Sequence, residues 1–169
     1  MRPIEAMALA ALAEQEAAGL LRRMQAIDGP QETWIERDGR RVLLLCSNNY
    51  LGLAAHPALA EAAVATLRET GVGAGASRLI SGSMRLHHVL EERLAQWKGA
   101  EAGLVFPTGY HANIGVITAL VGRGDAVFSD QLNHASLIDG CRLSGAEVQV
   151  FPHNDMAVLA RLLAASRAR

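Results

Sequence analysis

The sequence predicts an α/β fold with a mostly parallel sheet and flanking helices, and two observations carry this prediction. Short apolar runs alternate with helical patterns between residues 103 and 151. The 169-residue chain is 50% hydrophobic and 20% charged, which is typical of a globular domain with a core. Because alternating strands and helices build parallel sheets, we expect one such sheet in the second half of the chain.

The stretch from Phe106 to Asp139 shows this alternation most clearly. The apolar run Gly103–Phe106 predicts a strand, and a helical pattern begins directly after Thr108. A second strand is expected at Ala126–Phe128, before a polar loop and a helix that opens at His134. Ligands of parallel sheets lie at the carboxyl ends of the strands, so Thr108 and His134 mark a candidate site.

The remaining elements follow from similar patterns. An amphipathic helix is expected at Ile4–Ile27, although its apolar start imitates a short signal peptide. The other expected elements are a hairpin around Asp38–Gly39, helices at His56–Thr70, Met84–Trp97 and Asp155–Ala165, and a strand at Glu147–Phe151. We expect residues 1–46 to form an N-terminal helix and hairpin segment, and residues 47–169 to form a second domain.

The predicted start of the helix after Thr108 is suited to an anion. A helix N-terminus has unpaired backbone N–H groups and a partial positive charge, and Gly109 allows a ligand to approach the backbone closely. Tyr110 and His134 add flat rings, so a phosphate on an aromatic cofactor is the functional interpretation. The alternative is that Thr108 is only a helix cap and His134 only a capping or surface histidine.

Charge and cysteine content exclude other classes of function. The net charge of −1 argues against nucleic acids and anionic membranes as partners, and no run of 18 apolar residues predicts a membrane span. Cys46 and Cys141 fit neither a zinc pattern nor a disulfide framework. His87 and Glu91 lie one helical turn apart, which is more typical of a solvated face than of a metal site. We therefore expect no metal.

Several motifs resemble those of one enzyme family. They are SNNYLGL at 47–53, GVGAGASRLISG at 71–82, LEERLAQWKGAEAGLVFPTGY at 90–110, NHASLIDG at 133–140 and FPHND at 151–155. In this order they resemble the α-oxoamine synthase family, from about Arg22 to the last residue. The family's members use pyridoxal 5'-phosphate to condense an amino acid with an acyl thioester, with loss of carbon dioxide.

The resemblance implies that residues 47–169 are an incomplete cofactor-binding large domain, the first part of a fold-type I (aspartate aminotransferase-like) large domain. It also implies a cytoplasmic homodimer. The most similar branch uses L-alanine and a pimeloyl thioester, either pimeloyl-CoA or a pimeloyl-carrier protein, in biotin biosynthesis. Glycine-using members, namely glycine C-acetyltransferase and 5-aminolevulinate synthase, are the alternative. The loop around Arg78 is compatible with both branches.

The resemblance also assigns residues. His134 is expected to be catalytic, to stack on the cofactor ring and to contact substrate. Gly109 and Tyr110 are expected to bind the cofactor, and Arg22 and Asn48 to bind substrate, with Arg22 on a carboxylate of the acyl donor.

One feature of the family's site lies outside the matched motifs. The lysine that binds the cofactor covalently comes later in the family's chains, and Lys98, the only lysine here, does not match its motif. We therefore expect the chain to be inactive by itself. A non-catalytic fragment or dimerisation remnant is the alternative from another class.

Overall fold

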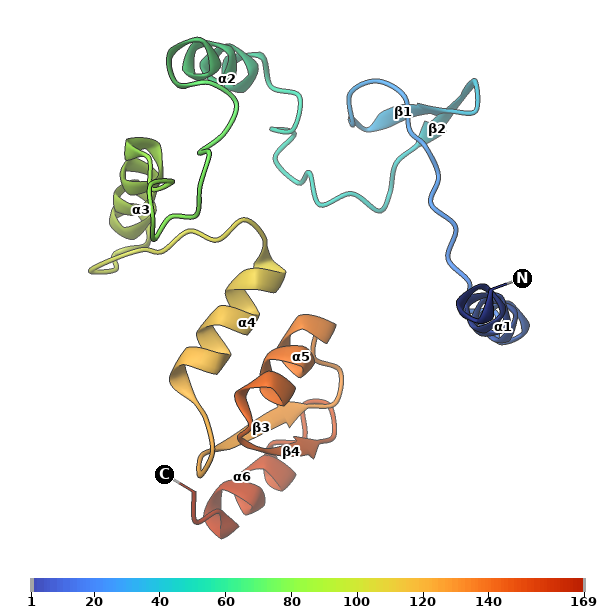
Figure 1. Ribbon diagram of the computed structural model, residues 1–169, viewed down its shortest axis with the longest axis vertical. Coiled ribbons are helices and arrows are strands. Elements are labelled where there is room, and N and C mark those ends of the chain that lie inside the picture. The colour runs from blue at the N-terminus through green and yellow to red at the C-terminus, as the bar shows by residue number, and fades with distance from the viewer. Residues whose placement is uncertain (1, 169) are drawn as a thin grey trace. The chain divides into compact units, whose positions relative to one another are not determined.

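A computed structural model describes residues 2–168, and their contacts divide the chain into two compact units, Met1–Gly73 and Ala74–Arg169. Each unit is described separately below (Figure 1). No helix among residues 2–168 is long and apolar enough to cross a membrane. The domain boundary expected after residue 46 stays a prediction.

The first unit contains α1 (Pro3–Ala17), the antiparallel strands β1 (Trp34–Arg37) and β2 (Arg40–Leu43), and α2 (Pro57–Thr70). Asp38 and Gly39 connect the strands with φ angles of 52° and 69°, as a two-residue type I′ hairpin requires. The predicted hairpin and the helix that ends at Thr70 are therefore confirmed.

The helix predicted at Ile4–Ile27 is too long. Gly19 adopts a left-handed φ of 68°, its N–H donates to the Glu16 carbonyl, and the Leu20 N–H donates to the Gln15 carbonyl. These two bonds form the Schellman motif that closes a helix at Ala17. The apolar pattern that continues past Gly19 misled the prediction.

The second unit contains α3 (Arg85–Lys98), α4 (Gly109–Leu120), α5 (Ala135–Ser144) and α6 (Met156–Ala165). Its strands β3 (Ala126–Asp130) and β4 (Glu147–Phe151) pair in parallel, with Ser129 opposite Val150. The helix α4 lies beside α5, and α6 contacts both strands (Figure 1). The predicted parallel sheet is confirmed for the strands expected at Ala126–Phe128 and Glu147–Phe151, and β3 is two residues longer than expected.

The strand predicted at Gly103–Phe106 is absent from the described part of the unit. Its backbone is bound by side chains instead, because the Val105 N–H donates to Glu91 Oε1 at 2.9 Å and Arg78 Nη1 donates to the Val105 carbonyl at 3.3 Å. An apolar run becomes a strand only where another strand supplies its hydrogen bonds. Here the side chains of Arg78 and Glu91 supply these hydrogen bonds in place of a neighbouring strand.

Candidate active site

The N-terminus of α4 has free backbone donors, as the sequence predicts. Thr108 caps the helix, since its Oγ1 accepts from the His111 N–H at 3.2 Å. Among residues 2–168, the N–H groups of Gly109 and Tyr110 have no acceptor. A Cβ added to Gly109 would meet no atom within 4 Å. The helix start is therefore open to an anion that approaches the backbone.

The N-terminus of α5 is capped by His134. Nδ1 of this exposed side chain accepts from the Ser136 N–H at 3.2 Å and lies 2.7 Å from Ser136 Oγ. Ser136 has 0% of its surface exposed, and its hydroxyl also accepts from Asn113 Nδ2 at 2.9 Å. The ring of His134 is thus fixed by its neighbours on one edge and exposed on the other.

Direct contacts bring these two helix starts together. Asn113 of α4 bonds to Ser136 of α5, and a Cβ on Gly140 would lie 2.9 Å from Ile117 Cδ1. These successive contacts mean that α4 and α5 run in the same direction with adjacent N-terminal ends (Figure 1). The structure therefore places the helix that begins with Gly109 and Tyr110 beside the helix that His134 caps.

Tyr110 is held by a second contact between these helices. Its hydroxyl donates to Asp139 Oδ2 at 3.0 Å, while 45% of the residue's surface stays exposed. This hydrogen bond to a carboxylate, with partial burial and the negative charge, raises the pKa of Tyr110 above its ordinary 10. The phenol is therefore a neutral donor that fixes the orientation of the ring.

Asp130 joins the carboxyl ends of the two strands. Its carboxylate accepts from the Leu132 N–H at 2.8 Å and the Asn154 N–H at 3.0 Å, and it lies 3.0 Å from His153 Nδ1. The two backbone donors lower the pKa of Asp130, with a smaller contribution from His153. The Asp130 carboxylate thus fixes the loop that leads to His134.

Arg78 and Glu91 form an ion pair beside the segment that leads into α4. Arg78 Nη1 lies 2.6 Å from Glu91 Oε1, and Nη2 lies 3.0 Å from Oε2. The Arg78 guanidinium and then the Val105 N–H lower the pKa of Glu91 to about 2. The expectation of a solvated face is wrong for Glu91, because only 8% of its surface is exposed.

Two of the three predicted substrate-binding residues, Arg22 and Asn48, lie in the first unit. Arg22 is exposed and follows α1 in an extended segment, so it is not in the helix where the sequence placed it. Asn48 is exposed, and its Oδ1 accepts from the Tyr50 hydroxyl at 3.3 Å. Neither position tests the assigned role.

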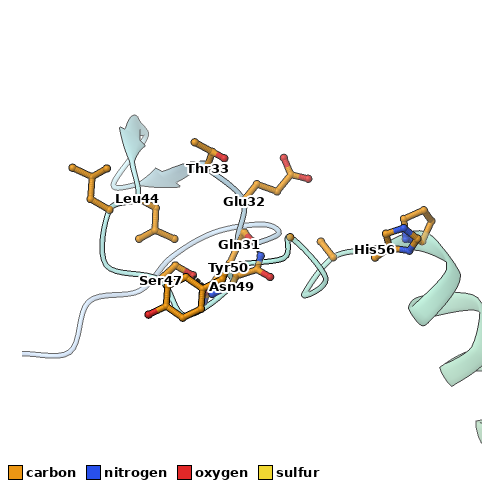
Figure 2. A pocket seen from close by; sticks show the side chains of 12 residues that line it. Gln31, Glu32, Thr33, Leu44, Ser47, Asn49, Tyr50 and His56 are labelled. Carbon is orange, nitrogen blue, oxygen red and sulfur yellow. Dashed lines mark hydrogen bonds between the residues drawn. The ribbon is translucent and has the colours of Figure 1, made fainter. Parts of the chain in front are cut away.

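A hollow of about 630 Å³ lies next to Asn48. Figure 2 shows its lining, which includes Gln31, Asn49, Tyr50 and His56. Asn49 organises this region, because its side chain donates to the Gln31 carbonyl at 3.1 Å and accepts from the Ala54 N–H at 3.1 Å. The polar turn after the hairpin is thus fixed by Asn49, and Asn48 points its amide to Tyr50.

Sequence reasoning missed three residues that organise the site, namely Asn113, Ser136 and Asp139. Each is a polar residue within a helical pattern, and the pattern does not indicate which residue its side chain contacts. A polar side chain on the inner face of a helix was the available signal. Its partner lies on another helix 23 to 29 residues away, so the pairing needed the structure.

Comparisons with known proteins agree with this geometry. Residues 40–169 match the family model described as aminotransferase class I and II. This match covers more than half of the chain, so the protein belongs to the aminotransferase class I and II family.

Two curated relatives show which members of this family the chain is similar to. The 8-amino-7-oxononanoate synthase of Geotalea daltonii is 59% identical over 151 residues, which are 89% of this chain and 38% of the relative. The synthase of the same name from Geobacter sulfurreducens is 60% identical over 149 residues, 88% of this chain and 38% of the relative. The chain thus spans about 38% of the length of these relatives.

Solved structures show the same fold. Serine palmitoyltransferase of Sphingomonas wittichii matches with a TM-score of 0.85 and 35% identity, over 93% of this chain and 41% of that chain. A high-resolution structure of SPT with PLP internal aldimine matches with a TM-score of 0.82 and 29% identity, over 98% of this chain and 43% of that chain. The predicted aminotransferase-like fold is confirmed for this part of it.

Proposed function

We propose that this chain supplies the phosphate-binding and ring-stacking part of an 8-amino-7-oxononanoate synthase that depends on pyridoxal phosphate. The observation that carries the proposal is the packing of two helices in a chain about 60% identical to such synthases. One helix starts with the open amides of Gly109 and Tyr110, and the other is capped by His134. The reaction is the condensation of L-alanine with a pimeloyl thioester, with loss of carbon dioxide, in cytoplasmic biotin biosynthesis.

Each site residue has a separate task in this proposal. The N–H groups of Gly109 and Tyr110 donate to the cofactor's phosphate, with help from the positive end of α4. The ring of His134 stacks on the cofactor ring, and its exposed edge donates a hydrogen bond to the substrate. When bound, pyridoxal phosphate withdraws electrons from the α-carbon of the amino acid.

The substrate-binding roles of Arg22 and Asn48 belong to the same proposal. A guanidinium binds a carboxylate through two parallel hydrogen bonds, which suits Arg22 to the free carboxylate of the pimeloyl group. The exposed amide of Asn48 supplies a donor and an acceptor for a substrate. The family resemblance also implies that the loop at residues 71–82 lies at a dimer interface. The homodimer is supported by Leu79 and Ile80 in this loop, which are 97% and 82% exposed.

The decisive experiment joins this chain to the remainder of the Geobacter sulfurreducens synthase. We expect this chimera to convert alanine and pimeloyl-CoA to 8-amino-7-oxononanoate, measured by mass spectrometry, and to prefer them to glycine with acetyl-CoA or succinyl-CoA. Preference for glycine would instead support the glycine-using branch. A folded chimera without any turnover would support the non-catalytic alternative.

A second experiment tests the 169-residue chain alone. Lys98 ends α3, next to Gly99 in a left-handed conformation, and its Nζ lies 4.7 Å from the Trp97 ring centroid. This position is explained without catalysis, so we expect no turnover and no stoichiometric covalent adduct after pyridoxal phosphate and borohydride. A stoichiometric adduct on Lys98, together with turnover, would contradict this interpretation.

A further inference from the structure

Three side chains form a hydrogen-bond relay from the interior of the second unit to its surface. Asn113 Nδ2 donates to Ser136 Oγ at 2.9 Å, and Ser136 Oγ lies 2.7 Å from His134 Nδ1. The middle residue is fully buried, whereas His134 is exposed. We refer to Asn113, Ser136 and His134 as the relay.

The direction of the relay follows from its fixed donors. The Ser136 backbone N–H can only donate, so His134 Nδ1, at 3.2 Å, is an acceptor and has no proton. The Asn113 amide nitrogen donates to Ser136 Oγ, which leaves the hydroxyl proton free to point to the same Nδ1. All bonds of the relay therefore point toward His134.

We propose that Asn113 and Ser136 are positioning residues that fix His134 as the neutral tautomer with its proton on Nε2. The relay makes the exposed edge of the ring a hydrogen-bond donor and holds the ring in one orientation. This inference rests on the proposed function for its use, because a substrate carboxylate or carbonyl oxygen needs such a donor. The hydrogen bonds of the relay form within the chain itself and require no bound cofactor.

The alternative is that His134 only caps α5 through the backbone N–H of Ser136. In that case Asn113 and the Ser136 hydroxyl would fill space, and changing them would leave the tautomer as it is. The two explanations differ for Asn113→Asp. A carboxylate at this position can only accept, so the Ser136 hydroxyl would donate to it and offer a lone pair to His134. The hydroxyl would then favour a proton on Nδ1, in competition with the Ser136 backbone N–H, which still favours a bare Nδ1.

The test is a ¹⁵N NMR measurement of the histidine rings in the full 169-residue chain at about pH 8.5, where an ordinary histidine is neutral. The signals of His134 are assigned by their absence in His134→Gln. We expect the Nε2–H tautomer to predominate in the wild type and the population of the Nδ1–H form to increase in Asn113→Asp. A predominant Nδ1–H tautomer in the wild type, or unchanged tautomer populations in a folded Asn113→Asp variant, would overturn the proposal.

Two further variants test whether the effect passes through the hydroxyl. Ser136→Ala removes the middle of the relay with little change in volume, so adding Asn113→Asp to it should no longer change the tautomer. Asn133→Asp places the same charge next to His134 in sequence, but Asn133 bonds to Ser129 outside the relay, and we expect no change. If the tautomer populations in the double variant or in Asn133→Asp change as much as in Asn113→Asp alone, the cause is a general effect of charge and the relay is refuted.

These measurements require no cofactor or substrate. If Asn113→Asp unfolds the chain, Ser136→Ala gives a separate result, because it should increase the motion of the His134 ring measured by relaxation of its carbon and nitrogen nuclei. Unchanged motion of the His134 ring in Ser136→Ala would contradict the proposal. Failure of the chimera to turn over with an intact relay would refute the proposed function alone.

Discussion

Replacing Gly109 by alanine should separate the stability of the fold from the binding of a phosphate. Gly109 is the first residue of α4, its φ lies outside the left-handed region, and an added Cβ would meet no atom within 4 Å. Alanine is therefore unstrained there. A Gly→Ala change at such a position stabilises a protein by about 0.4–1 kcal/mol, because the unfolded chain loses conformational freedom. We expect unfolding in urea to show an unchanged or higher stability.

The same methyl group should weaken cofactor binding. In the proposed site it would occupy the space through which a phosphate approaches the N–H groups of Gly109 and Tyr110. Loss of one hydrogen bond to a charged group costs about 1.5–3 kcal/mol, which raises Kd by about 10- to 150-fold. The assay is a spectroscopic titration of the chimera with pyridoxal phosphate, in wild type and Gly109→Ala.

Gly122→Ala is the matched control for this prediction. The nearest atom to its added Cβ is the Ser144 carbonyl oxygen at 3.9 Å, an ordinary contact, and the residue lies after the opposite end of α4. We expect wild-type cofactor affinity in this variant. Wild-type affinity in Gly109→Ala as well would refute the assignment of the α4 N-terminus as the phosphate site.

Three other predictions concern pH, packing and chemistry. The pKa of Glu91 is lowered from 4.5 to about 2, so the stabilisation that its carboxylate gives the fold is present above about pH 4.5 and lost as the pH falls toward 2. Glu91→Gln should therefore flatten the fall of Tm with pH in this window. An unchanged slope of Tm against pH would contradict this prediction. Gly140→Val should lower the free energy of unfolding by about 1–3 kcal/mol, measured in urea, because even its Cβ would lie 2.9 Å from Ile117 Cδ1, and an undiminished stability would disprove this close packing. In the chimera, His134→Ala should lower kcat by about 10²–10⁴-fold, whereas His134→Phe should recover cofactor affinity without rate; near-wild-type kcat in His134→Ala would end the functional assignment.

Local signals predicted the elements whose ends are determined locally. Thr108 and His134 each cap a helix as expected, and Gly99 ends α3 in a left-handed conformation. The prediction for α1 was wrong because an apolar pattern continued past Gly19, whose φ of 68° ends the helix. A periodic pattern shows which residues could share a helix face, but a single glycine can decide whether the helix continues.

Contacts between distant segments could not be predicted from the sequence. The run at Gly103–Phe106 has the composition of a strand, yet Val105 bonds to the side chains of Arg78 and Glu91. Likewise, nothing near Asn113 in sequence indicates that its amide reaches Ser136 on another helix. Strand formation and side-chain pairing both depend on which segments meet, and periodicity carries no information on that.

The sequence left two interpretations of His134 open, a helix cap or a site residue, and the structure makes them compatible. Capping uses only Nδ1, which accepts from Ser136, so the Nε2 edge of an exposed ring stays available. Thr108 likewise uses only part of the helix start for capping, because it accepts from the His111 N–H and leaves the N–H groups of Gly109 and Tyr110 open. A capping residue at a helix start therefore does not compete with ligand binding there. It holds the backbone donors and the ring in place, and this rigidity is what a phosphate and a stacked cofactor require.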